Sequence, residues 1–119
     1  KTGLAVSFVS DQRLYDATYQ ERYMGLLGDN AKGYHDGSPI NFAKNLQGTL
    51  MIIHGTGDDN VHFSNFEMLT NELIKYNKLF QFMAYPNRTH SIKEGEGTRK
   101  HLSTLYTDYL RRYCPGGGR

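Results

Sequence analysis

Two short polar segments of the chain carry side chains that could do acid–base chemistry. Asp58-Asp59-Asn60 follows the apolar run Leu50 to His54 through a Gly-Thr-Gly turn, and His90 follows a second apolar run over 80–85. A buried carboxylate can accept the Nδ1–H of an imidazole, which leaves Nε2 free to take a proton from a nucleophile. Asp58 comes first after the glycine turn, so Asp58 and His90 are the candidate catalytic pair.

These residues also have ordinary structural interpretations. Asp and Asn favour turns for local reasons, so the segment 58–60 could be a solvated turn in which Asp59 points to solvent or bonds the following amides. A lone loop histidine such as His90 carries little information without a partner. The remaining histidines lack ligand spacing, so we predict no metal site and no cofactor; they are His35, His54, His62 and His101.

The elements that must position the pair follow from apolar periodicity. Strands are predicted over 4–9, 50–54 and 80–85, and helices over about 15–24, 38–46, 63–77 and 102–113, with a polar loop over 28–37. Ser38 is the expected N-cap of the second helix, because Pro39 follows it. This alternation predicts the α/β class, with a mostly parallel sheet covered by helices on both faces.

The predicted sheet brings the two polar segments together. Parallel strands end at one edge of an open α/β sheet, where loops from several elements converge. Both the Asp58 loop and the His90 loop leave that edge. Asp before His also matches the last two members of the α/β-hydrolase order Ser, Asp, His, so the first member is expected upstream.

Composition excludes several classes of partner. The chain has 119 residues and a formal charge of +2 without a basic run, so we expect no nucleic-acid partner. No apolar run is long enough to span a bilayer, so we expect a soluble segment without membrane contact. A single cysteine, Cys114, gives no information on the compartment. The chain begins at Lys1 next to an apolar run, which favours a piece of a longer protein.

Two longer motifs carry a resemblance. "YDATYQERYMG" (15–25) and "HGTGDDNVHF" (54–63) resemble the dipeptidyl peptidase IV group of the prolyl oligopeptidase family of serine peptidases. The resemblance implies that residues 1–114 are the C-terminal part of an α/β-hydrolase catalytic domain, with 115–119 as a flexible tail. It also implies a missing N-terminal part, a β-propeller, a periplasmic or extracellular location, and release of N-terminal dipeptides after proline or alanine.

The resemblance also implies roles for individual residues. Asp58 matches the triad aspartate and His90 the triad histidine. Asn60 matches an asparagine whose side-chain amide holds a substrate carbonyl. The remaining matches line the pocket for the residue before the scissile bond; they are Tyr15, Tyr19, Val9 and Val61. Such a pocket suits a small, flat, apolar side chain such as proline. On periodicity alone, Tyr15 and Tyr19 could instead form the buried face of a helix.

The sequence departs from the family pattern in two ways. Ser91 follows the histidine where relatives often have glycine, and no G-x-S-x-G nucleophile motif occurs. We therefore expect the chain by itself to be inactive, and the missing N-terminal part or a second copy to be its partner. Alternatives are another peptidase or an esterase with the same triad, or a non-catalytic α/β ligand-binding module that holds Mg²⁺ on paired carboxylates.

Overall fold

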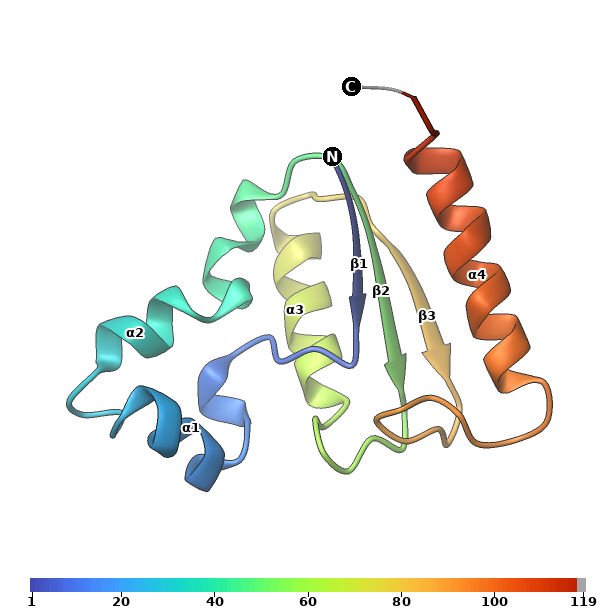
Figure 1. Cartoon of the computed structure of the whole chain (residues 1–119). Coiled ribbons are helices and arrows are strands. Elements are labelled where there is room, and N and C mark those ends of the chain that lie inside the picture. Colours follow the sequence, from blue (N-terminus) through green and yellow to red (C-terminus); the bar gives the residue numbers. More distant parts are fainter. Residues whose placement is uncertain (118–119) are drawn as a thin grey trace.

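A three-stranded parallel sheet organises the molecule. The computed structural model describes residues 1–117, with strands β1 (Thr2–Val6), β2 (Thr49–Gly55) and β3 (Gln81–Tyr85) in the order β1-β2-β3. Leu4 pairs with Met51, and Ile53 pairs with both Val6 and Met83. All three arrowheads point to the same edge of the sheet (Figure 1), so the loops that follow the strands start close together.

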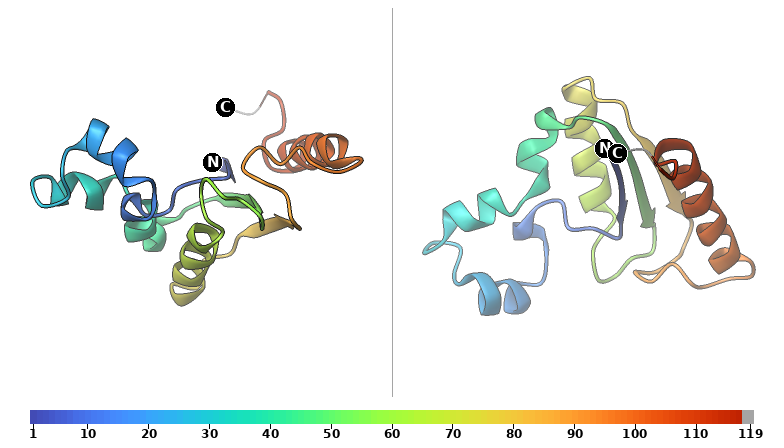
Figure 2. Two further views of the ribbon diagram at one scale, coloured as in Figure 1. Left: turned by 90° about the horizontal axis from the view of Figure 1, so that it is seen from below. Right: turned by 45° about the horizontal axis from the view of Figure 1, so that its top comes forward.

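Helices cover both faces of the sheet. Successive residues of a strand point to opposite faces, and the buried residues of β2 divide in this way. Ile52 packs with α3 (Ser64–Lys75) and the 3₁₀ helix η2 (Pro39–Asn45), while Met51 and Ile53 pack with Tyr109 of α4 (Thr98–Tyr113). Figure 2 shows α3 and α4 on opposite sides of the strands. The predicted α/β class is confirmed.

The segment between β1 and β2 lies to one side of the sheet (Figure 1) and contains three short elements before η2. They are the 3₁₀ helix η1 (Gln12–Leu14), α1 (Ala17–Met24) and α2 (Ala31–Asp36). The predicted polar loop over 28–37 is therefore wrong in part. The side chain of Asn30 caps α2 by accepting the backbone N–H of Gly33. Asn is a preferred N-cap residue, but the segment is predicted as a loop because Gly28 and Gly33 are poor helix formers.

Other predicted boundaries shift by a few residues. The first strand ends at Val6 rather than Val9, because Ser7 takes a left-handed conformation (φ 45°) that ends the ladder. The helix predicted over 15–24 starts at Ala17, where Asp16 caps it. Ser38 occupies the N-cap position of η2, but its hydroxyl donates to the carbonyl of Tyr34 instead of capping.

The C-terminal helix ends close to the predicted domain boundary. Helix α4 ends at Tyr113, with Cys114 as its C-cap residue. Residues 118 and 119 of the predicted tail lie outside the described part of the chain. No helix within residues 1–117 combines the length and the hydrophobicity needed to cross a membrane.

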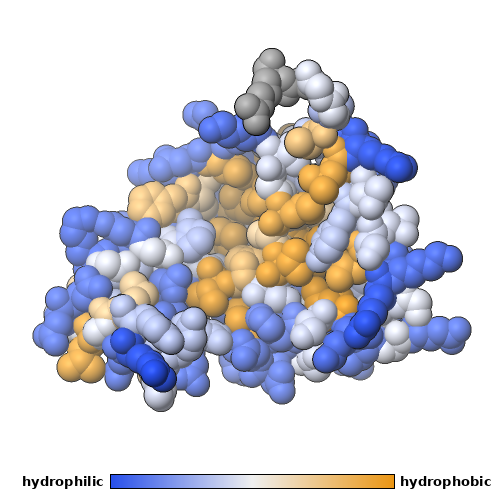
Figure 3. Space-filling view, in the orientation of Figure 1, coloured by the Kyte–Doolittle hydropathy of each residue, from blue (hydrophilic) through white to orange (hydrophobic). Residues whose placement is uncertain are grey.

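One edge of the sheet carries exposed apolar surface. Within residues 1–117, β1 pairs only with β2, so its other edge has no strand beside it. Figure 3 shows apolar side chains gathered around β1 and the neighbouring side of α4. Val6 on β1 is 37% exposed and Leu110 on α4 is 42% exposed. Apolar side chains at an open edge are suited to further packing or strand pairing.

A glycine at the end of β2 allows the His90 loop to lie against the sheet. A Cβ on Gly55 would overlap the carbonyl oxygen of Arg88. We therefore expect Gly55→Ala to lower the free energy of unfolding by about 1–3 kcal/mol, the usual cost of overpacking. Urea denaturation of the 119-residue chain measures this. Gly28→Ala is the matched control, because a Cβ there meets nothing within 4 Å; equal losses in both variants would contradict the prediction.

Candidate functional site

The carboxylate of Asp58 lies buried just beyond the end of β2. The strand ends at Gly55, and the turn that follows is fixed by bonds from Thr56 N–H to Tyr85 O (2.9 Å) and from Gly57 N–H to Arg88 O (3.1 Å). Asp58 is only 4% exposed. The turn is thus anchored to the neighbouring strand, which places the carboxylate between β2 and the loop after β3.

Backbone amides hold one oxygen of this carboxylate. Asp58 Oδ1 accepts the N–H groups of Asn60 (3.0 Å) and Val61 (2.9 Å). The sequence allowed such turn bonds for Asp59, but in the structure Asp58 makes them and Asp59 is exposed. The interpretation of the segment as a wholly solvated turn is wrong, because its first carboxylate is inside the protein.

The other oxygen faces His90. His90 Nδ1 lies 3.0 Å from Asp58 Oδ2, and the side chain of His90 is 44% exposed. The carboxylate can only accept, so Nδ1 carries the hydrogen in this pair. Among residues 1–117, no hydrogen bond engages Nε2 of the same ring. The geometry leaves Nε2 able to accept a proton at the surface.

Several contacts fix the His90 loop. Ser7 Oγ donates to the carbonyl of His90 (2.7 Å), which ties the loop to the end of β1. Ile92 is buried among Met51, Ile53 and Tyr109, and holds a left-handed conformation (φ 46°) that is rare for a β-branched residue. Strain of this kind persists only where the surrounding packing over-determines it, so the loop is firmly held.

A carboxylate inside the same loop completes its hydrogen bonding. Glu94 accepts the backbone N–H groups of Thr89 (3.1 Å) and Lys93 (3.2 Å), together with the hydroxyl of Thr89. These bonds, the Thr89 hydroxyl first, lower the pKa of Glu94 to about 2. Arg88 secures the next turn by donating to Glu94 O and to Thr98 Oγ1.

The predicted binding residues lie around a hollow beside His90. This hollow has a volume of about 350 Å³ and is lined by side chains from four segments: Ser7, Val9, Gln12, Tyr15, Tyr19, Gln20, Asn60, Val61 and His90. All five predicted substrate-binding residues are in this set. The structure thus brings together residues that are up to 83 positions apart in sequence, between Ser7 and His90. Their roles stay predictions.

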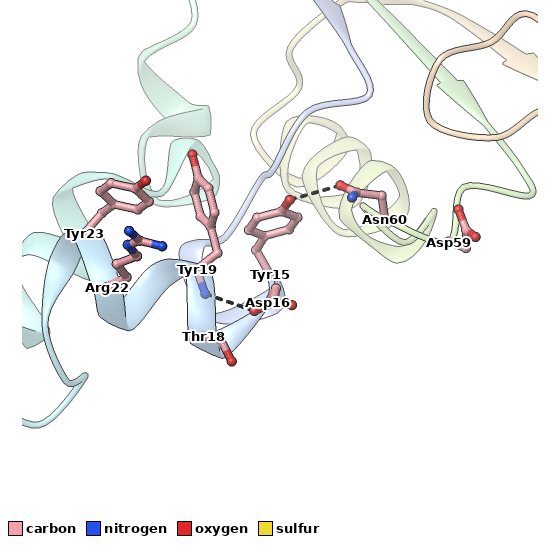
Figure 4. Close-up of a pocket in the computed structure, with 8 residues that line it drawn as sticks. All are labelled: Tyr15, Asp16, Thr18, Tyr19, Arg22, Tyr23, Asp59 and Asn60. Atoms are coloured by element: carbon pink, nitrogen blue, oxygen red, sulfur yellow. Dashed lines mark hydrogen bonds between the residues drawn. The ribbon is translucent and has the colours of Figure 1, made fainter.

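The tyrosines do not form the buried face of a helix. Tyr15 precedes α1, and Tyr19 and Tyr23 are 54% and 67% exposed, while Gln20 is the buried residue of the helix. Figure 4 shows the three tyrosine rings in a row. The rings of Tyr15 and Tyr19 meet edge to face at 5.5 Å. Their periodicity therefore marks a surface of aromatic side chains and not a core.

Tyr15 also contacts the Asp58 loop. Its hydroxyl donates to Asn60 Oδ1 at 3.1 Å (Figure 4), which leaves the Asn60 amide nitrogen without a protein partner in the described part of the chain. A second hollow, of about 490 Å³, is also lined by Tyr15, Tyr19 and Asn60, together with Arg22 and Asp59. The amide of Asn60 is a free donor beside the aromatic rings.

Buried polar contacts place the tyrosine segment. Asn65 at the start of α3 accepts both the backbone N–H (2.9 Å) and the hydroxyl (3.1 Å) of Ser10. Gln12 N–H donates to Ser38 Oγ (2.8 Å). Ser10, Ser38 and Asn65 are each at most 1% exposed. The chain between β1 and Tyr15 is therefore fixed to α3 and η2 by these side chains and by one backbone bond, from Ile40 N–H to Ser10 O (3.0 Å).

Sequence reasoning missed three residues of this site. Ser7 and Asn65 gave no signal, because single polar residues near strand or helix ends are common. His54 was treated only as a potential metal ligand, yet it is fully buried and its Nε2 lies 3.2 Å from Asp58 Oδ2. Its position inside an apolar strand next to the Asp58 turn was the available signal.

Comparison with known proteins decides the family. The family model described as the prolyl oligopeptidase family matches residues 1–116. The chain belongs to the prolyl oligopeptidase family. The resemblance carried by segments 15–25 and 54–63 is thereby confirmed.

Similar proteins show that the chain corresponds to a small part of the length of other prolyl oligopeptidase family members. Probable dipeptidyl peptidase 4 from Aspergillus clavatus is 47% identical over 124 residues, which cover 96% of this chain and 16% of that protein. Prolyl endopeptidase FAP from Mus musculus is 36% identical over 115 residues, 94% of this chain and 15% of that protein. The crystal structure of Porphyromonas gingivalis dipeptidyl peptidase 4 matches with a TM-score of 0.91 and 41% identity, over 95% of this chain and 16% of that chain.

The Glu94 bonds give this prolyl oligopeptidase family chain a testable pH dependence. These bonds need the ionised carboxylate, and they lower its pKa from the ordinary 4.5 to about 2. Their contribution to stability is therefore fully present above pH 4.5 and is lost as the pH falls through about 2. In ¹H–¹⁵N spectra, the Thr89 amide shift should titrate with a midpoint near 2. Glu94→Gln should remove that titration, and Glu96→Gln, which changes an exposed carboxylate, should leave it. A midpoint near 4.5 would contradict the prediction.

Proposed function

We propose that this chain supplies the aspartate, the histidine and part of the substrate pocket of a serine peptidase that releases N-terminal dipeptides after proline or alanine. The observation that carries the proposal is the bond between His90 Nδ1 and Asp58 Oδ2 (3.0 Å), with the partly exposed His90 ring on a hollow lined by tyrosine and valine side chains. The chain spans 15–16% of the length of the relatives compared above. The nucleophilic serine therefore belongs to another part of the full-length protein.

His90 is the proton carrier in the proposed reaction. Its Nε2 takes the proton of the serine hydroxyl as the serine oxygen bonds to the scissile carbonyl carbon, and it then gives that proton to the leaving amine. Water repeats the exchange and releases the dipeptide from the acyl-enzyme. The buried carboxylate of Asp58 keeps the hydrogen on Nδ1 and stabilises the imidazolium that forms in each step.

The hollow beside His90 supports the substrate class. The rings of Tyr15 and Tyr19 offer flat apolar surface, and Val9 and Val61 line the same hollow. A proline ring fits such walls, whereas a charged side chain would lose its hydration without gaining a partner. The free amide nitrogen of Asn60 lies beside the rings and can donate to a substrate backbone carbonyl. The same hollow argues against an esterase with an unrelated pocket.

The ligand-binding alternative has less support. A Mg²⁺ site needs carboxylate oxygens that are free to coordinate the ion. Both oxygens of Asp58 accept N–H groups of the protein, from Asn60 and Val61 on one side and from His90 on the other. Asp58 is therefore occupied, and the acidic pair 58–59 cannot act as a two-carboxylate ion clamp.

Replacing Asp58 tests the proposed triad. In a full-length protein that carries this chain, Asp58→Asn should lower kcat by about 10⁴, because an amide can no longer select the productive tautomer of the histidine. The melting temperature, measured in parallel, separates this loss from unfolding. Asp59→Asn is the matched control and should cost far less, since Asp59 is exposed. A larger loss for Asp59→Asn would reverse the assignment within the pair.

Substrate preference tests the pocket. Exchanging proline for alanine in the substrate removes two or more methylene contacts at about 0.8 kcal/mol each, which predicts a roughly ten- to hundredfold preference for Xaa-Pro over Xaa-Ala amides in kcat/KM. Tyr19→Ala should remove most of this preference. Asn60→Ala should lower kcat/KM for both substrates alike, because every substrate shares the backbone carbonyl. Fastest turnover of an Xaa-Lys amide would refute the pocket and leave the triad standing.

A further inference from the structure

A second histidine touches the carboxylate of Asp58 from inside the protein. His54 lies at the end of β2 and is fully buried. Its Nε2 is 2.8 Å from the carbonyl oxygen of Val61 and 3.2 Å from Asp58 Oδ2. Asp58 Oδ2 is the same oxygen that faces His90 Nδ1 at 3.0 Å. Two imidazoles therefore meet at one carboxylate oxygen.

The surroundings of His54 assign its hydrogen. Nε2 faces two oxygens, the Val61 carbonyl and the Asp58 carboxylate, and both can only accept, so Nε2 carries the N–H. Nδ1 is buried without a hydrogen-bond partner in the described part of the chain. Aromatic rings enclose the imidazole edge to face, from Phe8 at 5.7 Å and Phe63 at 5.8 Å. A second N–H directed at these rings would be an unpaired buried donor, so Nδ1 carries a lone pair.

We propose that His54 is a positioning residue for the Asp58–His90 pair: its Nε2–H donates to the Val61 carbonyl, and the same N–H dipole, with Nε2 3.2 Å from Asp58 Oδ2, takes up part of the charge of that oxygen. This inference rests on the proposed function, because it concerns the same pair. The bond to the Val61 carbonyl adds a second effect, since Val61 lines the hollow beside His90. One buried ring thus aligns both the carboxylate and a wall of the pocket.

The proposed contact predicts in which direction His54 affects the protonation of His90. A carboxylate oxygen that already lies beside one N–H dipole stabilises an imidazolium on its other side less strongly than an oxygen without such a neighbour does. Removing the His54 donor should therefore increase the tendency of His90 to bind a proton. A side chain that only fills space would have no such effect.

The other ionisable groups near the pair do not bond the His90 ring within residues 1–117. Arg88 donates to Pro86 O and Thr98 Oγ1, and Glu94 is bonded to Thr89. Besides Asp58 and His90, the titratable side chains that line the hollow are Tyr15 and Tyr19, and the charged side chains that bond within the His90 loop are Arg88 and Glu94. All of them remain unchanged in the variants below.

The first test needs no variant. ¹H–¹⁵N correlation spectra of the imidazoles of the 119-residue chain, recorded over a pH series, report the tautomer of each of its five histidines. We expect His54 to show hydrogen on Nε2 and none on Nδ1 throughout the range in which His90 titrates. Hydrogen on Nδ1 of His54, or titration of His54 together with His90, would overturn the proposal.

The second test compares two substitutions. His54→Met fills a similar volume without a donor, and His54→Gln can place an amide N–H near the position of Nε2. We expect the titration midpoint of His90 to be higher in His54→Met than in the wild-type chain, by roughly half a pH unit or more, and to return toward the wild-type value in His54→Gln. An unchanged or lower midpoint in His54→Met, or an equal shift in both variants, would overturn the proposal.

The readout separates this inference from the proposed function. The midpoint of His90 is measured without substrate or nucleophile, so a full-length protein that lacked peptidase activity would not affect it. The spectrum of each variant also shows whether the chain is folded. If His54→Met does not fold, the tautomer measured in the wild-type chain still decides the proposal.

Discussion

The buried carboxylate of Asp58 sets the strictest requirement in this structure. A carboxylate that is 4% exposed is costly unless hydrogen-bond donors replace its hydration. Here the donors are two backbone amides of its own loop and His90 from the loop after β3, and Nε2 of His54 at the end of β2 lies 3.2 Å from the same carboxylate. These segments meet only if β2 and β3 are parallel neighbours that end in register, as Gly55 and Tyr85 do. The hydrogen bonding of the buried Asp58 carboxylate thus depends on the topology of the sheet.

Much of this fold could be predicted because its elements are regular. Strand β2 and helix α3 carry strong apolar patterns, and both appear close to the predicted ranges. Errors occurred where apolar side chains leave the regular elements. Phe8 and Val9 extend the apolar run of β1, but Ser7 ends the strand, and the two side chains serve the site instead: Phe8 packs on His54 and Val9 lines the hollow. Hydrophobicity alone does not separate a strand from a pocket wall.

The candidate site was predictable to a different degree. Asp58 and His90 could be paired in advance, because the ends of parallel strands converge on one edge. Asn60 and the tyrosines came from the resemblance, since spacing by itself favoured a buried helix face for Tyr15 and Tyr19. The place of His54 in an apolar strand indicated a buried residue near Asp58, but its effect could not be predicted, because that effect depends on which carboxylate oxygen its ring meets. That contact is set by the turn geometry of residues 55–58, which depends in turn on Arg88 and Tyr85 of the next strand and loop.

A second buried carboxylate shows what distinguishes Asp58. Asp11 is 2% exposed and, like Asp58, accepts the backbone N–H of the residue two positions later. It also accepts the Ser38 hydroxyl (3.4 Å) and bonds the guanidinium of Arg13 (2.6 Å), which holds the pKa of Asp11 below its ordinary value. Arginine keeps its proton at any physiological pH, so this pair fixes a turn and nothing more. Asp58 instead faces an imidazole whose second nitrogen reaches a hollow. A buried carboxylate becomes a candidate for acid–base chemistry only when its partner can exchange a proton at an atom that a substrate can reach.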